Sequence, residues 1–227
     1  EAGPVGQRLR EAMENFKDLA RTGDREVAEI ARADQIDVAI DLTGPMDKGR
    51  PQIMSLRAAP LQISYLGYPG SMGAEYIDYI IGDSFLIPRG FEKYYSEKII
   101  FMPHTYQAQD DQLVFGTEVP PRSTLGLPED AFVFCAINGA YKITPEVFDI
   151  WMQLLAAVEN SVLWLFCQNE EARRNLIQET IYRGVHPSRV IFASKVDHAK
   201  YLSRFRAADL YLDTFNYNAG ATASHAL

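Results

Sequence analysis

Short apolar runs rich in β-branched and aromatic residues alternate along the chain with longer segments in which apolar residues recur at helical spacing. The short runs are bounded by Gly, Pro and Asp and therefore predict buried strands. The predicted strands are residues 36–42, 61–67, 76–81, 98–103, 132–137, 162–166, 189–193 and 209–213. The predicted helices are residues 7–19, 24–33, 50–58, 145–158, 169–183 and 197–207, followed by the start of another helix at the end of the chain. This alternation is typical of right-handed βαβ units on parallel sheets, so the fold class is α/β.

The segment 105–128 is polar, contains Pro120 and Pro121, and has few periodic apolar positions. It predicts a linker between two α/β units, residues 1–104 and residues 129–227.

Composition narrows the class of protein. The chain has 227 residues, of which 47% are hydrophobic and 23% charged, as in ordinary globular domains. Its formal net charge of -8 argues against nucleic acid or an anionic membrane as a partner, because both need a basic surface. No leader pattern and no membrane-length apolar stretch is visible, and Cys135 and Cys167 lie inside apolar runs as expected of buried packing residues. We therefore expect a cytoplasmic protein.

Three loops of the second half carry candidate chemistry, because open parallel sheets bind ligands at the carboxyl ends of their strands. The loop 138–146 presents Tyr141 and Lys142 beside a strand end. The segment 193–204 places His198, Tyr201 and Arg204 at helical spacing on one face.

The third loop contains Asn218, Gly220 and Thr222, where backbone N–H groups could approach an anion at the start of a helix. A lysine, a helix start and a stackable ring together would suit a nucleoside diphosphate. Taken singly, each feature is more often a surface lysine, an ordinary turn or the flank of an amphipathic helix. Neither GxGxxG nor GxxxxGK[ST] occurs in these loops, so the residues alone do not specify the ligand.

Four longer stretches, residues 57–83 ("RAAPLQISYLGYPGSMGAEYIDYIIGD"), 94–105 ("YYSEKIIFMPHT"), 126–165 and 189–227, closely resemble the catalytic region of the protein O-GlcNAc transferase family. The likeness extends over about residues 24–227 and includes the SPINDLY-like and the bacterial, tetratricopeptide-repeat-associated members. It implies two Rossmann-like lobes of the GT-B type, both incomplete in this chain. It also implies inverting, metal-independent transfer of N-acetylglucosamine from UDP-GlcNAc to Ser or Thr hydroxyls of an acceptor protein, without a cofactor.

The resemblance also implies roles for particular residues. Lys142 matches the lysine that stabilises the departing UDP and is the expected catalytic residue. The residues expected to bind the donor are Leu66, Gly67, Pro69, Tyr141, Val196, His198, Tyr201, Arg204, Asn218, Gly220, Ala221 and Thr222. Further candidates are His104, Thr105, Gly139 and His225. No metal ligand is expected.

Several departures from the family pattern leave alternatives open. Pro45, Met46 and Asp47 stand where polar or basic sugar contacts are expected, and His225 replaces an aspartate. The chain begins with Glu1 rather than Met and stops inside a predicted helix, and the family's catalytic histidine would lie upstream, so we expect a piece of a longer protein that is inactive alone. The alternatives are a non-catalytic nucleotide-binding or scaffold module and a fucosyltransferase-like relative that uses a GDP-sugar.

Overall fold

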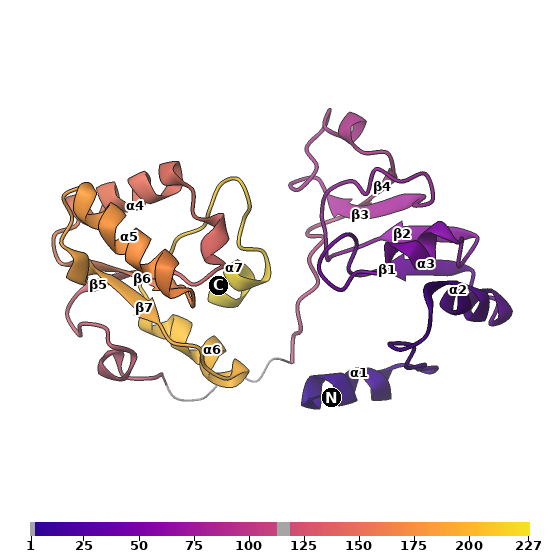
Figure 1. Cartoon of the computed structure of the whole chain (residues 1–227), viewed down its shortest axis with the longest axis horizontal. Helices are drawn as coiled ribbons and strands as arrows, with labels where there is room; N and C mark the ends of the chain where they lie inside the picture. Colours follow the sequence, from indigo (N-terminus) through magenta and orange to yellow (C-terminus); the bar gives the residue numbers. More distant parts are fainter. Residues whose placement is uncertain (1–2, 113–118) are drawn as a thin grey trace. The chain divides into compact units, whose positions relative to one another are not determined.

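The computed structural model describes residues 3–112 and 119–227, and the chain divides into two compact units, residues 1–108 and 109–227 (Figure 1). The division falls within the segment expected to be a linker, of which residues 113–118 lie outside the described part. In the described residues no helix is long and apolar enough to cross a membrane.

The first unit is built on a parallel sheet with the strand order β1-β2-β3-β4. Its strands are β1 (Val38–Asp41), β2 (Leu61–Ser64), β3 (Tyr79–Asp83) and β4 (Lys98–Met102). Its helices are α1 (Pro4–Ala12), α2 (Asp24–Ala33), α3 (Pro51–Ser55) and the 3-10 turn η1 (Glu92–Tyr94). Strands that follow one another across a sheet are joined by crossovers on one face. Apolar side chains such as Val38 and Ile40 consequently stay exposed on β1.

The second unit contains a parallel sheet with the order β7-β6-β5-β8. Its strands are β5 (Phe132–Ala136), β6 (Ser161–Phe166), β7 (Val190–Ala193) and β8 (Leu210–Tyr211). Its helices are α4 (Pro145–Ala157), α5 (Glu170–Tyr182), α6 (His198–Arg204) and α7 (Ala221–Ala226), with 3-10 turns η2 (Arg122–Leu125), η3 (Ala140–Lys142), η4 (Pro187–Arg189) and η5 (Phe205–Ala207).

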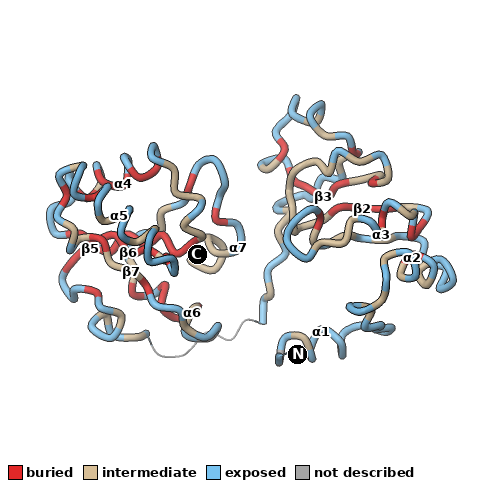
Figure 2. Tube along the Cα trace, in the orientation of Figure 1, coloured by how far each residue is buried: buried red, intermediate tan, exposed pale blue. Residues whose placement is uncertain are grey.

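Two apolar clusters cover the two faces of this second sheet. One joins Phe134 and Leu163 to Phe148 and Trp151 of α4, and the other joins Cys135 and Trp164 to residues of η5 and η2. Strands β5 and β6 are therefore buried along nearly their whole length (Figure 2). Continuous apolar strands are what a sheet covered on both faces requires.

The predicted strands and their parallel arrangement are confirmed, while three segments differ from the prediction. The first helix ends at Ala12 rather than near residue 19, because Met13 is extended and the apolar side chains Met13 and Phe16 are exposed without a core to pack on. The helix after β1 ends at Ser55. The last part of the expected linker belongs to the second unit, since Arg122 donates hydrogen bonds to the carbonyls of Ala131 and Ala207.

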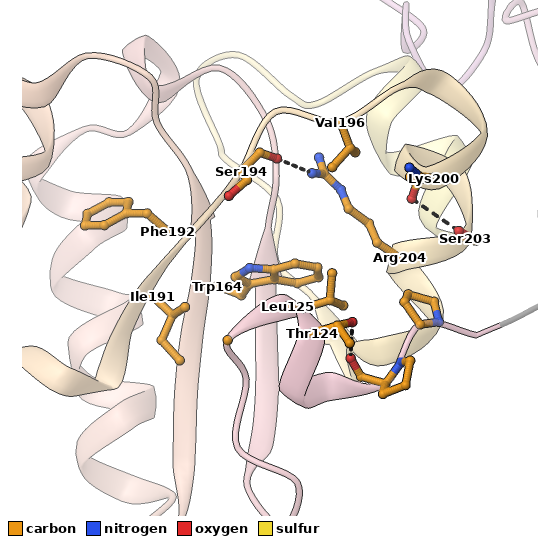
Figure 3. A pocket seen from close by; sticks show the side chains of 13 residues that line it. Thr124, Leu125, Trp164, Ile191, Phe192, Ser194, Val196, Lys200, Ser203 and Arg204 are labelled. Carbon is orange, nitrogen blue, oxygen red and sulfur yellow. Dashed lines mark hydrogen bonds between the residues drawn. The ribbon is translucent and has the colours of Figure 1, made fainter.

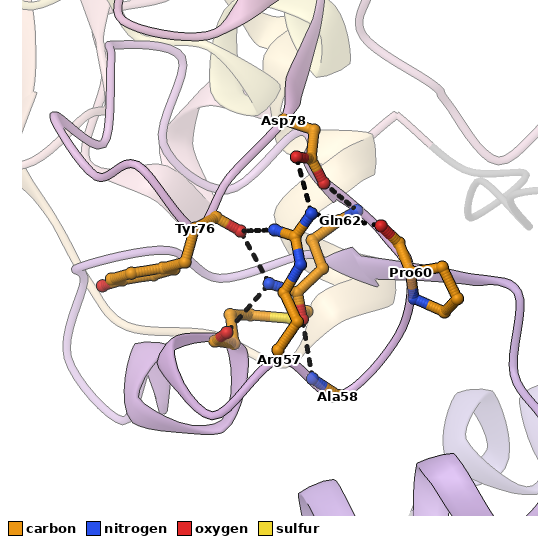
Figure 4. Close-up of polar contacts among 7 residues, drawn as sticks. Arg57, Ala58, Pro60, Gln62, Tyr76 and Asp78 are labelled. Atoms are coloured by element: carbon orange, nitrogen blue, oxygen red, sulfur yellow. Dashed lines mark hydrogen bonds and ion pairs between the residues drawn. The ribbon is translucent and has the colours of Figure 1, made fainter.

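The first unit is held together by a buried amide, Gln62, which is 0% exposed. Its Oε1 accepts from the N–H of Ala58 at 2.9 Å, and its Nε2 donates to the carbonyls of Met54 at 2.8 Å and Tyr76 at 2.6 Å. Arg57, which has a positive φ of 55°, closes the same network through Asp78, Pro60 and Tyr76 (Figure 4). Every polar atom of the Gln62 side chain is thus paired, as is usual for buried amides.

Replacing Gln62 by Leu keeps the volume and removes three hydrogen bonds whose backbone partners stay buried. We expect the free energy of unfolding to fall by roughly 2–4 kcal/mol, measured by urea denaturation. The control is Gln52→Leu on the exposed side of α3, which should change the unfolding free energy by about 0.5 kcal/mol or less. Equal midpoints for the two variants would contradict this account of the first unit.

Candidate functional site

The order of the second sheet creates a point where the chain changes direction. Strands β5, β6 and β7 follow one another toward one edge of the sheet, and β8 then pairs with the other side of β5. Loops that leave two adjacent strands at such a reversal diverge toward opposite faces of the sheet, and ligands bind in the crevice between them. The loops after β5 and β8 are therefore the candidate site. The described strands of the first unit show no such reversal.

Lys142 connects these two loops. It ends η3, and its Nζ donates a hydrogen bond of 2.8 Å to the carbonyl of Asn218 in the loop after β8. The same ammonium lies 4.3 Å from the centroid of the Tyr217 ring. Burial lowers the pKa of Lys142, and the carboxylate of Asp213 opposes that shift. The structure thus brings together Lys142 and Asn218, both of which the sequence predicted.

The loop after β8 is shaped by its own polar side chains. Asp213 accepts hydrogen bonds of 2.7 Å from the N–H groups of Thr214 and Ala219. The hydroxyl of Thr214 donates to the carbonyl of Tyr217, and the side-chain amide of Asn218 donates to the carbonyl of Thr214. These bonds hold residues 213–219 in one tight turn before α7.

Gly220 makes the turn into α7 with φ 58° and ψ -122°, a conformation that is practically restricted to glycine. A Cβ at this position would meet nothing within 4 Å, so glycine is required here by the backbone conformation and not by a lack of space. Gly139 is constrained differently, because a Cβ there would lie 2.4 Å from the ring of Tyr141. Tyr141 itself is exposed, and its ring meets that of Tyr217 edge to face.

An aromatic cluster lies between α6 and α7. The rings of His198 and Tyr201 on α6 have centroids 6.2 Å and 5.7 Å from the ring of His225. A side-chain hydrogen bond joins Tyr201 to Thr222, although burial still raises the pKa of the tyrosine. Burial, and then the neighbouring His198, lower the pKa of His225. Four of the predicted residues therefore meet in this cluster.

Arg204, which the sequence predicts on the same helix face as His198 and Tyr201, is almost fully buried, with 4% of its surface exposed. Its Nη1 donates to the carbonyl of Ser194 at 3.0 Å, and its guanidinium lies 4.9 Å from the centroid of the Tyr201 ring. Its Nε has no partner among the residues that the structure describes.

A pocket of about 870 Å³ opens beside Arg204 (Figure 3). Val196 and Arg204 line it at the end of β7, and Leu125, Trp164 and Ile191 form apolar walls. The pocket lies at β6 and β7, away from the reversal between β5 and β8. The pocket therefore lies beside the segment 193–204 rather than beside the loops that carry Lys142.

The candidates of the first unit lie after its strands. Leu66, Gly67 and Pro69 form the loop after β2, in which Leu66 has a positive φ of 70°. A Cβ on Gly67 would lie 2.3 Å from the carbonyl oxygen of Leu42, so only glycine allows this loop to rest on the loop after β1. His104 and Thr105 follow β4 and are exposed.

The loop after β1 holds the three residues that depart from the family pattern. Asp41 accepts hydrogen bonds from the N–H groups of Thr43 and Gly44 and so starts the turn. Pro45, Met46 and Asp47 are all exposed. Their contact with a sugar stays a prediction.

Several residues of the site escaped the sequence analysis. Tyr217, Asp213 and Asn138 were not expected to take part, although an aromatic residue and a carboxylate after a strand end are visible signals. The sequence analysis did not identify the apolar walls of the pocket, because one of them, Leu125, lies in the segment expected to be a linker. In the described part of the chain, no group of three or more His, Cys, Asp or Glu side chains could hold a metal ion.

The chain was compared with known proteins. The model of glycosyl transferase family 41 matches residues 5–119 and 108–227. A probable UDP-N-acetylglucosamine–peptide N-acetylglucosaminyltransferase SEC of Arabidopsis thaliana is 34% identical over 226 residues, which is 97% of this chain and 23% of that protein. The UDP-N-acetylglucosamine–peptide N-acetylglucosaminyltransferase of Caenorhabditis elegans is 24% identical, over 91% of this chain and 28% of its own length.

Among solved structures, a lysine-to-methionine variant of the Thermobaculum terrenum O-GlcNAc transferase matches with a TM-score of 0.87 and 25% identity. The match covers 100% of this chain and 43% of that one, so the chain carries parts of the two Rossmann-like lobes of a GT-B fold. The chain spans about a quarter of the length of the curated relatives it matches. The family match covers nearly every residue, and the chain belongs to glycosyl transferase family 41.

Proposed function

We propose that the chain forms the donor-binding part of a glycosyltransferase that transfers N-acetylglucosamine from UDP-N-acetylglucosamine to Ser or Thr hydroxyls of proteins. The observation that carries the proposal is the placement of Lys142 between the loops after β5 and β8, at the reversal of the strand order. The names of the relatives in Arabidopsis thaliana and Caenorhabditis elegans support the donor and the acceptor class.

In this proposal Lys142 stabilises the departing UDP. Breaking the bond between the sugar and the diphosphate puts negative charge on a phosphate oxygen, and a fixed ammonium lowers the energy of that charge. Backbone N–H groups at the start of α7 would add donors beside the same phosphates. The oxygen of the acceptor hydroxyl would bond to the sugar carbon on the face opposite the departing UDP, with inversion, and the hydroxyl proton would pass to a base outside this chain.

The pocket beside Arg204 is the proposed place of the nucleotide base. Its lining includes the cations of Arg204 and Lys200 and no Asp or Glu. The indole N–H of Trp164 is also without a partner among the described residues. These donors suit the carbonyl acceptors of uracil, and they suit O6 and N7 of guanine as well. The donor named for the relatives therefore supports a UDP-sugar over the GDP-sugar alternative, and the charge of the pocket does not.

Lys142→Met should weaken catalysis far more than binding, because the ammonium matters most when charge develops on the leaving group. In the complete protein that contains this chain, we expect kcat to fall about 100-fold or more while the Kd for UDP rises about tenfold or less. Single-turnover transfer and calorimetric titration measure the two quantities. Arg174→Met, which removes an exposed cation from α5, is the control and should change neither. Equal losses in both would assign Lys142 to simple binding.

Gly220→Val should abolish UDP binding, because a β-branched residue cannot adopt this backbone without moving the loop before α7. The matched control is Gly184→Val after α5, where φ is 74° and a Cβ would also meet nothing within 4 Å. Both variants should lose stability, and only Gly220→Val should lose UDP affinity in an NMR titration. Retained affinity in Gly220→Val would remove the loop from the site.

The base preference can be measured without knowing the acceptor. We expect UDP to bind about tenfold or more tightly than GDP, since the donor named for the relatives is UDP-N-acetylglucosamine. Competition between the two nucleotides on the same sample gives the ratio directly. A ratio in favour of GDP would support the fucosyltransferase-like alternative instead.

A further inference from the structure

Asn138 is a buried amide at the site whose polar atoms have no partner. It follows β5 by two residues and is 4% exposed. Neither its Nδ2 nor its Oδ1 has a hydrogen-bond partner among the described residues. Leaving a buried donor or acceptor unpaired costs about 1–3 kcal/mol for each group. Among the side chains with such atoms in the described residues, Asn138 has two of them, beside the end of β5.

The contrast with Gln62 shows that the fold can satisfy such a group. Gln62 is the same kind of side chain, is buried in the other unit, and has three hydrogen bonds to backbone groups. An amide whose Nδ2 and Oδ1 both lack a partner therefore differs from the usual structural amide. These two atoms of Asn138 are better explained by a partner from outside the described residues.

The sheet register places Asn138 at the reversal of the strand order. Phe134 pairs with Leu210, Cys135 pairs with Tyr211, and the N–H of Leu212 donates to the carbonyl of Cys135. Continuing this register brings Asn138 level with Thr214 at the start of the loop after β8. Lys142, four residues further along the chain, reaches Asn218 in that same loop.

The loop after β8 is tied to Lys142, which follows Asn138 in the loop after β5. The bond from Lys142 to the Asn218 carbonyl and the contact with the Tyr217 ring hold it in place. An anion paired with the Lys142 ammonium would compete with both contacts. A shift of the loop after β8 would then let the anion approach the end of β5.

We infer that Asn138 is a donor-binding residue whose Nδ2 donates a hydrogen bond to the diphosphate of the nucleotide sugar. This inference rests on the proposed function. Its Oδ1 cannot face the ionised phosphate, so it accepts from a hydroxyl of the ribose or the sugar. A nucleoside diphosphate offers one amide both an acceptor, on its diphosphate, and a donor, on a ribose hydroxyl.

The test separates binding from stability. Asn138→Leu keeps the volume and removes two unpaired polar atoms, so the ligand-free chain should unfold at the same or a higher urea concentration. Its affinity for UDP should nevertheless fall about tenfold or more, because a hydrogen bond to a charged group is lost. A structural amide would give the opposite result in the free chain, as expected for Gln62→Leu.

NMR of the 227-residue chain gives a direct readout. The side-chain amide signals of Asn138 are identified by their loss in Asn138→Leu, and they should shift when UDP is added but stay in place when uridine is added. The control is the side-chain amide of Asn160, which donates to the carbonyl of Asp130 at the opposite end of the sheet and should not move.

The outcomes distinguish the two proposals. If UDP shifts no signal of the unmodified chain, the proposed function fails. If UDP binds but the Asn138 amide does not shift, or Asn138→Leu binds UDP as tightly as the unmodified chain, only the role of Asn138 is wrong. A lower urea midpoint for Asn138→Leu would show that the amide is satisfied in solution and would also overturn the inference.

Discussion

The candidate site depends on the pairing of β8 with β5. Strand β8 has only two residues, and the carboxylate of Asp209 before it fixes its register. Asp209 accepts from the N–H of Val133 at 2.8 Å and from the guanidinium of Arg122 at 2.7 Å, while its own N–H donates to the carbonyl of Val133. A slip by one residue would exchange the faces of β8 and carry the following loop away from Lys142.

Buried polar groups are fully paired at some places in the chain and unpaired at others. Around Gln62 and Arg57, side chains and backbone satisfy one another, and this network ties α3 to β2 and β3. Asn138 after β5, Arg204 on α6 and Asp41 at the end of β1 keep buried polar atoms without a partner among the described residues. A ligand that supplied hydrogen bonds to Asn138 or Arg204 would offset the cost of leaving those atoms unpaired.

Charge is also distributed unevenly. The chain carries a net charge of -8, yet the charged residues that line the pocket beside Arg204 are two cations, Arg204 and Lys200. Near Lys142 the carboxylate of Asp213 accepts hydrogen bonds from two backbone N–H groups and opposes the lowering of the Lys142 pKa by burial. The net charge therefore bears on the solubility of the chain, while the local arrangement of charged side chains bears on which ligand can bind.

The sequence alone determined the strands, most helices and the α/β class, because side-chain periodicity and turn residues are local properties. The resemblance of four of its stretches to known sequences indicated the family. It also placed Lys142 beside a strand end. It could not show that β8 returns beside β5, that Lys142 bonds to Asn218, or that Asn138 stays unpaired. The end of the first helix and the end of the linker also differ from the prediction. Phe16 is exposed with no core to pack on, and Arg122 donates to the carbonyl of Ala207, far along the chain. These features depend on contacts between residues far apart in the chain, and only the packed tertiary structure decides which of them form.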